Sequence, residues 1–342
     1  MVSAALVISI VLVLGVIFVN GWTDAPNAIA TVVSTRCLSP RAAVILAVIF
    51  NTLGAGFMTL VNAKVAFTIS NMVRFDGAAS EDAPLIVLAA SLFAIVVWAS
   101  AAWYFGIPTS ESHALIAGIT GGAIALGNGF GAINGQEWSK VLIGLGVSSV
   151  LGFGSGFLIA RLVMFLFRNA RRSFTERFFT RGQIFGASCM AFMHGAQDGQ
   201  KFMGVFMLAL FLNGAASRNA DGSFAVHGWL IILCSLTMGL GTSAGGYRII
   251  KAVGMDMVKL ERYQGFVADL TAAGCLLASS LTGIPVSTTH TKTTAIMGVG
   301  SARRLSSVNW MVVKEMVLAW VLTFPGCGLI GYLMAKLCLL IF

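Results

Sequence analysis

Two short polar motifs each occur twice in this chain. Gly-Trp-Thr-Asp-Ala-Pro-Asn at residues 21–27 has a counterpart at residues 195–201, Gly-Ala-Gln-Asp-Gly-Gln-Lys. Gly-Ile-Pro-Thr-Ser-Glu-Ser-His at residues 106–113 has a counterpart at residues 283–290, Gly-Ile-Pro-Val-Ser-Thr-Thr-His. In both copies, about 90 residues separate the motif aspartate (Asp24 or Asp198) from the motif histidine (His113 or His290). Ionisable groups inside apolar sequence are costly to bury unless a ligand or a partner compensates them, so the duplicated residues are the candidate functional site.

The composition is that of a protein embedded in lipid. The chain has 342 residues, of which 57% are hydrophobic and only 10% charged, and its mean hydropathy is +0.89. Long apolar runs without alternation favour helices over barrel strands, and the length allows on the order of ten membrane segments, counting half-spans. We therefore expect an all-α, multi-pass protein of the plasma (inner) membrane, with residues 1–20 as its first segment and not a cleaved leader.

Charge and cysteine usage exclude several other classes of protein. The net charge is +9, but the basic residues are dispersed over the loops between apolar segments, so we expect contact with the lipid bilayer and none with nucleic acid. The six cysteines lack metal-ligand spacing. Ser, His and Asp occur together, yet the whole set is duplicated, whereas a hydrolase needs one asymmetric nucleophile and base. We therefore predict that the chain is not an enzyme.

The loop charges predict an inverted repeat. The most basic stretch, residues 168–181, is assigned to the cytoplasm by the positive-inside rule, together with Arg36 and Arg41. The acidic residues assigned to the outside are Asp76, Glu81, Asp82 and Asp221. The two copies then run in opposite directions, with residues 1–167 as the first repeat, residues 168–181 as a basic cytoplasmic linker and residues 182–342 as the second repeat.

Discontinuous helices and helical hairpins are expected at the motifs. Gly, Pro, Asn or Gln interrupts both aspartate-bearing segments, and in the other motif a proline ends one helix while Ser or Thr caps the next. Free N–H groups at such helix starts favour anions, so two of them at mid-membrane form a seat for a tetrahedral oxyanion. The hydroxyl donors predicted for this seat are Thr109, Ser110, Ser112, Ser287, Thr288 and Thr289.

These motifs resemble those of the inorganic phosphate transporter (PiT) family, in particular its bacterial low-affinity branch. The resemblance covers the whole chain and includes Phe50-Asn51-Thr52-Leu53-Gly54 and the stretch from Gly241 to Arg248. It implies secondary transport of phosphate by symport, as a homodimer without a prosthetic group, with co-transported H⁺ or Na⁺. It also implies a substrate and ion region at Thr23, Asp24, Asn27, Gln197, Asp198, Lys201 and the two Ser/Thr-His clusters. Asn51 stands where sodium-coupled members commonly have Glu, so the resemblance favours proton coupling.

Several of these residues have more than one interpretation. Asp24 and Asp198 either accept the proton of HPO₄²⁻, coordinate sodium or a metal–phosphate complex, or carry the coupling proton. Lys201 either pairs with Asp198 three residues earlier or contacts substrate. Lys292 either attracts the anion or extends to a membrane edge. The other candidates for contact with the coupling ion are Asn51, His113, His290 and Glu111. For the two histidines a structural bracing role is favoured, and for Glu111 an interaction with the helix dipole is the alternative.

The residues leave two alternative functions open. Sulfate has the size and shape of phosphate, and the resembled family includes sulfate permeases. Sulfate carries no proton at neutral pH, so a site with an obligatory carboxylate acceptor rejects it. A passive anion channel would differ from a transporter in being insensitive to proton and sodium gradients.

Overall fold

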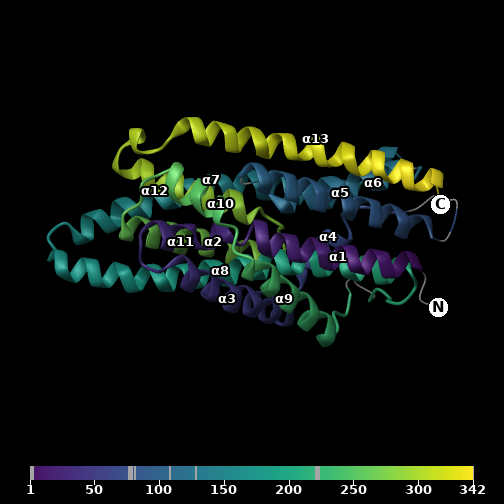
Figure 1. The fold of residues 1–342 in the computed structure, drawn as a ribbon, viewed down its shortest axis with the longest axis horizontal. Helices are drawn as coiled ribbons and strands as arrows, with labels where there is room; N and C mark the ends of the chain where they lie inside the picture. Colours follow the sequence, from purple (N-terminus) through teal and green to yellow (C-terminus); the bar gives the residue numbers. More distant parts are fainter. Residues whose placement is uncertain are drawn as a thin grey trace.

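The protein is a bundle of long helices, described by a computed structural model for residues 4–341 except 76–79, 81, 108, 128 and 220–223. The helices run along the long axis of the molecule, with the turn between α7 and α8 at one end and both chain ends at the other (Figure 1). The α-helices are α1 (Ala4–Thr23), α2 (Pro26–Ser34), α3 (Pro40–Val61), α4 (Lys64–Ser70), α5 (Ala83–Phe105), α6 (Glu111–Ala125), α7 (Gly135–Phe167), α8 (Arg172–Leu212), α9 (Gly228–Ser243), α10 (Tyr247–Lys251), α11 (Arg262–Thr282), α12 (Thr288–Arg303) and α13 (Trp310–Ile341). Shorter turns form η1 (Gly129–Ala132), η2 (Ala252–Asp256) and η3 (Leu305–Ser307).

The all-helical membrane architecture is confirmed. Six helices are long and apolar enough to cross a membrane. A seventh span results if α9 and the segment Tyr247–Asp256, which is bent by 68° relative to α9, are counted together as one span. The first aspartate motif lies within one of these six, Ala4–Ser34, whereas α6, α8 and α12, which carry parts of the other motifs, are not among them in the described part of the chain. Residues 172–181, most of the predicted linker, form the first turns of α8. Asp76, Glu81 and Asp221, which we assigned to the outside, lie outside the described residues.

The first aspartate motif interrupts its helix as predicted. Between α1 and α2, Asp24 and Ala25 form a turn, in which the Asn27 N–H bonds the Asp24 carbonyl oxygen at 3.0 Å. Pro26 has no N–H with which to continue the ladder of α1, so its position accounts for the break. Asp24 therefore lies where helical backbone pairing is incomplete.

The second aspartate motif does not break its helix, contrary to our prediction. Helix α8 runs without interruption through residues 195–201. This copy has no proline, and its glycines serve close packing against α3. A Cβ on Gly195 would collide with the carbonyl oxygen of Asn51, and one on Gly199 would lie 2.6 Å from the Cβ of Ala55. The missing side chains thus let two backbones approach closely.

Both Pro-Ser-His motifs form helical hairpins. Helices α5 and α11 end at Gly106 and Gly283, whose φ angles of 70° and 76° favour glycine. The next helices begin with serine caps: the Ser110 hydroxyl accepts a hydrogen bond from the His113 N–H at 3.3 Å, and the Ser287 hydroxyl accepts one from the His290 N–H at 3.1 Å. The predicted capping is confirmed in both copies, and each cap contributes about 0.5–2 kcal/mol to its helix.

Small residues bring the hairpin helices close to the outer helices. Helix α6 packs mainly on α13, and α12 mainly on α7. A Cβ on Gly121 would collide with the carbonyl oxygen of Gly328, and one on Gly156 would lie 2.8 Å from the carbonyl oxygen of Ala295. The two hairpins that start at the candidate anion seat are therefore held by backbone-to-backbone packing.

Candidate functional site

The two motif aspartates meet in one buried cluster. Asp24 at the α1–α2 break is 1% exposed, and Asp198 in the middle of α8 is fully buried. The Thr288 hydroxyl, in the first turn of α12, lies 3.5 Å from Asp24 Oδ2 and 3.3 Å from Asp198 Oδ2. One hydroxyl thus bridges carboxylates that are far apart in the sequence and belong to different copies of the motif.

Asp24 is held by uncharged donors. Asn27 Nδ2 donates to Asp24 Oδ1 at 2.6 Å, and the Thr289 hydroxyl donates to the same oxygen. Asn27 Nδ2 also lies 3.3 Å from Thr289 Oγ1. The first turn of α2 and the first turn of α12 therefore converge on one carboxylate.

Asp198 is held by a cation as well as by uncharged donors. Lys201 Nζ donates to Asp198 Oδ1 at 2.7 Å, and Asn20 Nδ2 donates to Oδ2 at 3.1 Å. Lys201 also donates to Ser112 Oγ at 2.7 Å and to the Val286 carbonyl oxygen at 2.6 Å. Of the two interpretations of Lys201, the ion pair with Asp198 is the one present in this structure. Lys201 in addition links α8 to both hairpins.

His194 is a site residue that the sequence reasoning missed. Its Nε2 lies 3.5 Å from Asp198 Oδ2, and its Nδ1 lies 3.0 Å from Asn51 Oδ1. Asn51 in turn donates to the Thr242 hydroxyl at 3.3 Å. Asn51 is thereby joined to the cluster through a histidine.

A repeated spacing could have revealed His194 and Asn20 before the structure. Each stands four residues before its motif aspartate, one helical turn away and on the same face. Both positions directly precede the glycine at which each repeated motif begins, so the motif comparison left them out. The missed pair adds an amide and an imidazole to the predicted site.

Three residues of the cluster can hold a cation. One ligand atom each from Asp24, His194 and Asp198 lie within 4.8 Å of one another, and all three side chains are buried. Carboxylate oxygens suit hard cations such as sodium, magnesium or manganese, whereas an imidazole suits transition metals such as zinc or iron. The predicted metal or sodium contact at Asp24 and Asp198 thus gains a third candidate ligand.

Other predicted residues lie near the cluster but bond to backbone groups. The Thr23 hydroxyl donates to the Val19 carbonyl oxygen at 2.9 Å, and Gln197 Nε2 donates to that of Ile284 at 3.4 Å. Ser110 and Ser287 act as the helix caps described above. Thr109 is half-buried in the α5–α6 connection, where its N–H bonds the Ile107 carbonyl oxygen at 2.9 Å. The motif residues that join the hydrogen-bonded cluster itself are Asp24, Asn27, Ser112, Asp198, Lys201, Thr288 and Thr289.

The two motif histidines contact each other. The His113 and His290 rings lie 4.4 Å apart, edge to face. His113 stacks on Phe324 at 4.6 Å and His290 on Trp320 at 3.7 Å. The two histidine rings are therefore packed against aromatic side chains of α13, in line with the structural bracing favoured from the sequence.

A second buried ion pair lies one turn away from the cluster. Lys292, one turn beyond Thr289 on α12, pairs with Asp269 of α11, and both side chains are fully buried. Asp269 also accepts from the Thr31 hydroxyl, at 2.8 and 2.9 Å, and from Gln183 Nε2 at 2.6 Å. Because Lys292 is fully buried, its side chain does not extend to a membrane edge in this structure, and its ammonium group is paired with the carboxylate of Asp269.

Acceptor oxygens remain unpaired around the cluster. Among the described residues, the buried atoms Asn20 Oδ1, Asn27 Oδ1, Gln197 Oε1 and Glu111 Oε2 have no hydrogen-bond partner. Buried polar groups are normally paired with protein, water or a bound species. Four unpaired acceptors require donors or cations, so the arrangement fits a ligand that brings protons or positive ions with it.

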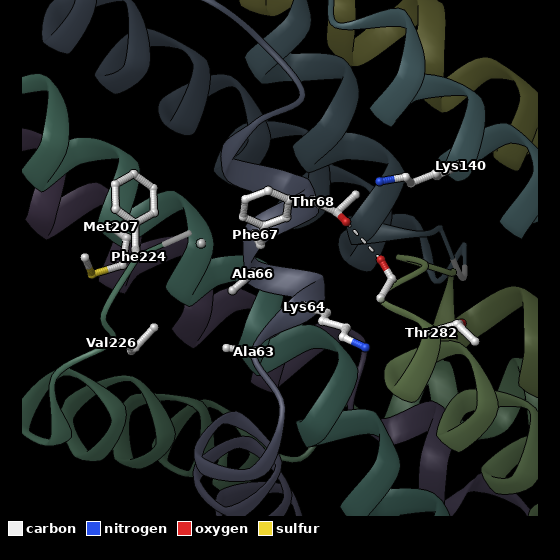
Figure 2. Close-up of a pocket in the computed structure, with 12 residues that line it drawn as sticks. Ala63, Lys64, Ala66, Phe67, Thr68, Lys140, Met207, Phe224, Val226 and Thr282 are labelled. Carbon is white, nitrogen blue, oxygen red and sulfur yellow. Dashed lines mark hydrogen bonds between the residues drawn. The ribbon is translucent and has the colours of Figure 1, made fainter. Parts of the chain in front are cut away.

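Two cavities border elements that also carry residues of the cluster. One, of about 480 Å³, is lined by Lys64, Thr68 and Lys140 and reaches Gly283 at the tip of the α11–α12 hairpin (Figure 2). The Thr68 hydroxyl donates to the Gly283 carbonyl oxygen at 2.9 Å. The other, of about 680 Å³, is lined by Ser34 and Thr35 at the end of α2, among others. None of the described lining residues of either cavity belongs to the cluster, which is enclosed by protein.

Taken together, these features define a multi-pass helical membrane protein with an enclosed, charged centre built from two copies of one motif set. A model of the phosphate transporter family matches residues 20–176 and, a second time, residues 168–331. The chain is 38% identical over 314 residues to a probable low-affinity inorganic phosphate transporter of Bacillus subtilis (strain 168), covering 92% of this chain and 91% of that protein. It is 39% identical over 316 residues to a protein of the same description from Rhizobium meliloti (strain 1021), with the same coverage. This chain belongs to the phosphate transporter family.

The fold agrees with a solved structure. A protein described as the sodium-dependent phosphate transporter superposes with a TM-score of 0.89 at 22% identity, covering 99% of this chain and 100% of that one. The family resemblance drawn from the motifs is confirmed by the family model and by the two relatives. Because the family consists of transporters, the comparison also supports the prediction that the chain is not an enzyme.

Proposed function

We propose that this chain is a secondary transporter that moves inorganic phosphate across the plasma membrane by alternating access, coupled to a proton or a sodium gradient. The observation that carries the proposal is the enclosed cluster in which Asp24 and Asp198 meet through the Thr288 hydroxyl. The relatives named for phosphate transport support the choice of substrate.

The donors and acceptors of the cluster suit hydrogen phosphate. When phosphate replaces their present acceptors, the Lys201 ammonium and the Ser112, Thr288 and Thr289 hydroxyls become donors for its oxygens. The first-turn N–H groups of α6 and α12 add to them. A carboxylate then accepts the proton of HPO₄²⁻. Sulfate offers no such proton, so its oxygens would face a carboxylate without a hydrogen between them.

Alternating access requires the enclosing contacts to open on one side at a time. The tip of the α11–α12 hairpin is tied by its carbonyl oxygens: Gly283 to Thr68, Ile284 to Gln197 and Val286 to Lys201. This tip lies between the cavity of Figure 2 and the cluster. We infer that movement of the tip connects that cavity to the site.

The proposal also includes an inverted repeat within the chain and a homodimer of the protein. The family model matches each half of the chain, and α1 leads away from the end with the chain termini whereas α8 leads back toward it (Figure 1). These two facts support a repeat in opposite orientation, the arrangement that alternating access exploits. The homodimer rests on the family resemblance alone.

Either coupling ion has support in the cluster. The group Asp24, His194 and Asp198 offers ligands to a cation, and the structurally similar protein is described as sodium-dependent. Two features argue against sodium. The charge of Asp198 is already neutralised by the ammonium of Lys201 at 2.7 Å, and the residue in contact with His194 is Asn51, an amide, where a carboxylate would attract a cation more strongly. An unpaired carboxylate oxygen on Glu111 offers a place for a proton.

The test is uptake of radiolabelled phosphate by purified protein in liposomes, under a proton gradient, a sodium gradient or neither. The proposal expects accumulation that depends on one gradient and resists excess unlabelled sulfate. Uptake that ignores both gradients would indicate a channel, and blockade by sulfate would indicate a different substrate.

The matched variants are Asp24→Asn and Asp198→Asn, with Glu176→Gln as control. Glu176 lies on the same helix as Asp198 but is exposed, with 52% of its side chain accessible. Both cluster variants should abolish gradient-driven uptake at unchanged protein yield, while the control keeps it. Normal uptake by both cluster variants would refute the assignment of the site.

A further inference from the structure

A groove at the end of the molecule opposite the chain termini combines exposed phenylalanines with arginines. It measures about 980 Å³ and follows the first turns of α8, next to the turn from α7. Phe174, Phe178 and Phe185 line it and are 56%, 43% and 62% exposed. Large aromatic side chains so exposed are costly in water and are expected where lipid or a partner covers them.

The spacing places the two kinds of side chain on one helix face. Phe174, Phe178, Arg181 and Phe185 follow one another at intervals of four, three and four residues, the repeat of an α-helical stripe. Phe266 of α11 forms the opposite wall and packs on Gly182, where a Cβ would lie 3.2 Å from its ring. The groove is thus a structured feature between two helices.

The arginines of the groove have no acidic partner. Arg171, Arg177 and Arg181 line it, and no ion pair involves any of them in the described part of the chain. The acid nearest in sequence, Glu176, is paired with Arg172 at 2.9 Å and lines the neighbouring cavity. Three uncompensated positive charges beside apolar surface call for an anion with an apolar part.

The groove lies at the depth where the apolar exterior of the bundle ends. On α7 the exposed apolar residues continue through Leu162, Phe165 and Leu166 and give way to Arg168. The Phe167 ring lies 5.5 Å from that of Phe178, which places Phe178 level with this boundary. Headgroup phosphates of a bilayer are found at such a boundary, with acyl chains on its apolar side.

We propose that this groove binds an anionic phospholipid, with the headgroup phosphate between Arg171, Arg177 and Arg181 and an acyl chain along Phe178 and Phe185, on the apolar side. The basic residues assign this end to the cytoplasmic leaflet. Free phosphate would use the charges but leave the aromatic wall exposed, and a neutral lipid would use the wall but leave the charges unpaired. Only an anionic lipid matches both.

The test compares lipid retention by native mass spectrometry of the full-length protein, using phosphatidylglycerol and phosphatidylcholine of the same acyl chains as probes. Phosphatidylglycerol should bind more tightly than phosphatidylcholine. Removing two arginines by R177Q/R181Q should weaken its binding by about 25-fold, because each basic side chain near a bilayer surface contributes about a factor of five to the affinity. The control R41Q/R304Q removes two exposed arginines outside the groove and should leave binding unchanged.

The charge-preserving variant R177K/R181K guards against a trivial folding defect and should retain most of the affinity. Equal binding of the two lipids, or equal losses in the groove and control variants, would overturn the proposal. Displacement of phosphatidylglycerol by millimolar inorganic phosphate would assign the groove to free phosphate instead. A dimer that dissociates only in R177Q/R181Q would assign it to a second copy of the chain.

Discussion

Lys292→Met tests whether the buried pair next to the cluster holds the core together. Lys292 and Asp269 are fully buried, so removing the ammonium leaves a carboxylate without its countercharge. Breaking such a pair costs about 3–5 kcal/mol. Asp269 keeps hydrogen bonds from Thr31 and Gln183, which places Lys292→Met toward the lower limit.

The reciprocal change should cost more. In Asp269→Leu, which removes both acceptor oxygens at similar side-chain size, the ammonium of Lys292 keeps, among the described contacts, the Thr31 hydroxyl at 3.2 Å. An ammonium carries three donors, so this variant leaves more hydrogen-bonding capacity unsatisfied and belongs toward about 5 kcal/mol. The double variant removes both charges and should be less destabilised than the sum of the single changes by about 2–3 kcal/mol.

The assay is the free energy of unfolding in mixed micelles, from titration with a denaturing detergent followed by tryptophan fluorescence. Lys140→Met is the control, because Lys140 pairs with Glu137 at 2.9 Å while 45% of its side chain is exposed. That change should cost only about 0.2–1 kcal/mol. A Lys292→Met variant no less stable than the control, or strictly additive effects in the double variant, would refute this reasoning.

Three further predictions concern the cluster and its supports. His194→Ala removes one ligand of the three-residue cation group and should raise the coupling-cation concentration for half-maximal uptake about tenfold, whereas an unchanged value in a concentration series would exclude a cation there. Gly195→Ala forces a Cβ against the Asn51 carbonyl oxygen and should lower the unfolding free energy by about 1–3 kcal/mol, while Gly154→Ala, which meets open space, should be neutral or slightly stabilising in the same titration. Ser287→Ala removes the α12 cap and should cost about 0.5–2 kcal/mol, with Ser287→Thr largely restoring stability; equal losses in both would show that capping is not its role.

Local chemistry made the hairpins predictable from the sequence. A glycine, a proline and a Ser three residues before a His are enough to specify a helix end and the next helix start. The caps at Ser110 and Ser287 therefore lie where the motif places them. The break at Pro26 was predictable for the same reason, because a missing N–H acts within one turn.

Packing between distant segments was not predictable in this way. Glycines in the second aspartate motif resemble helix breakers in sequence, and only the nearness of α3 reveals them as packing positions. The partner of Lys292 is likewise supplied by another helix, at Asp269. Residue types indicate that a buried charge needs compensation, but the three-dimensional arrangement decides which group provides it.

The two motif aspartates differ in the group that neutralises their negative charge, and this difference bears on the movement of charge during transport. The charge of Asp198 is balanced by Lys201, a residue of the same chain, so Asp198 needs no ion from solution. In the described contacts Asp24 accepts hydrogen bonds from Asn27, Thr288 and Thr289, all of them neutral. The sensitivity of turnover to membrane voltage should therefore reside in Asp24, and currents recorded on a supported membrane would report how many charges accompany each phosphate.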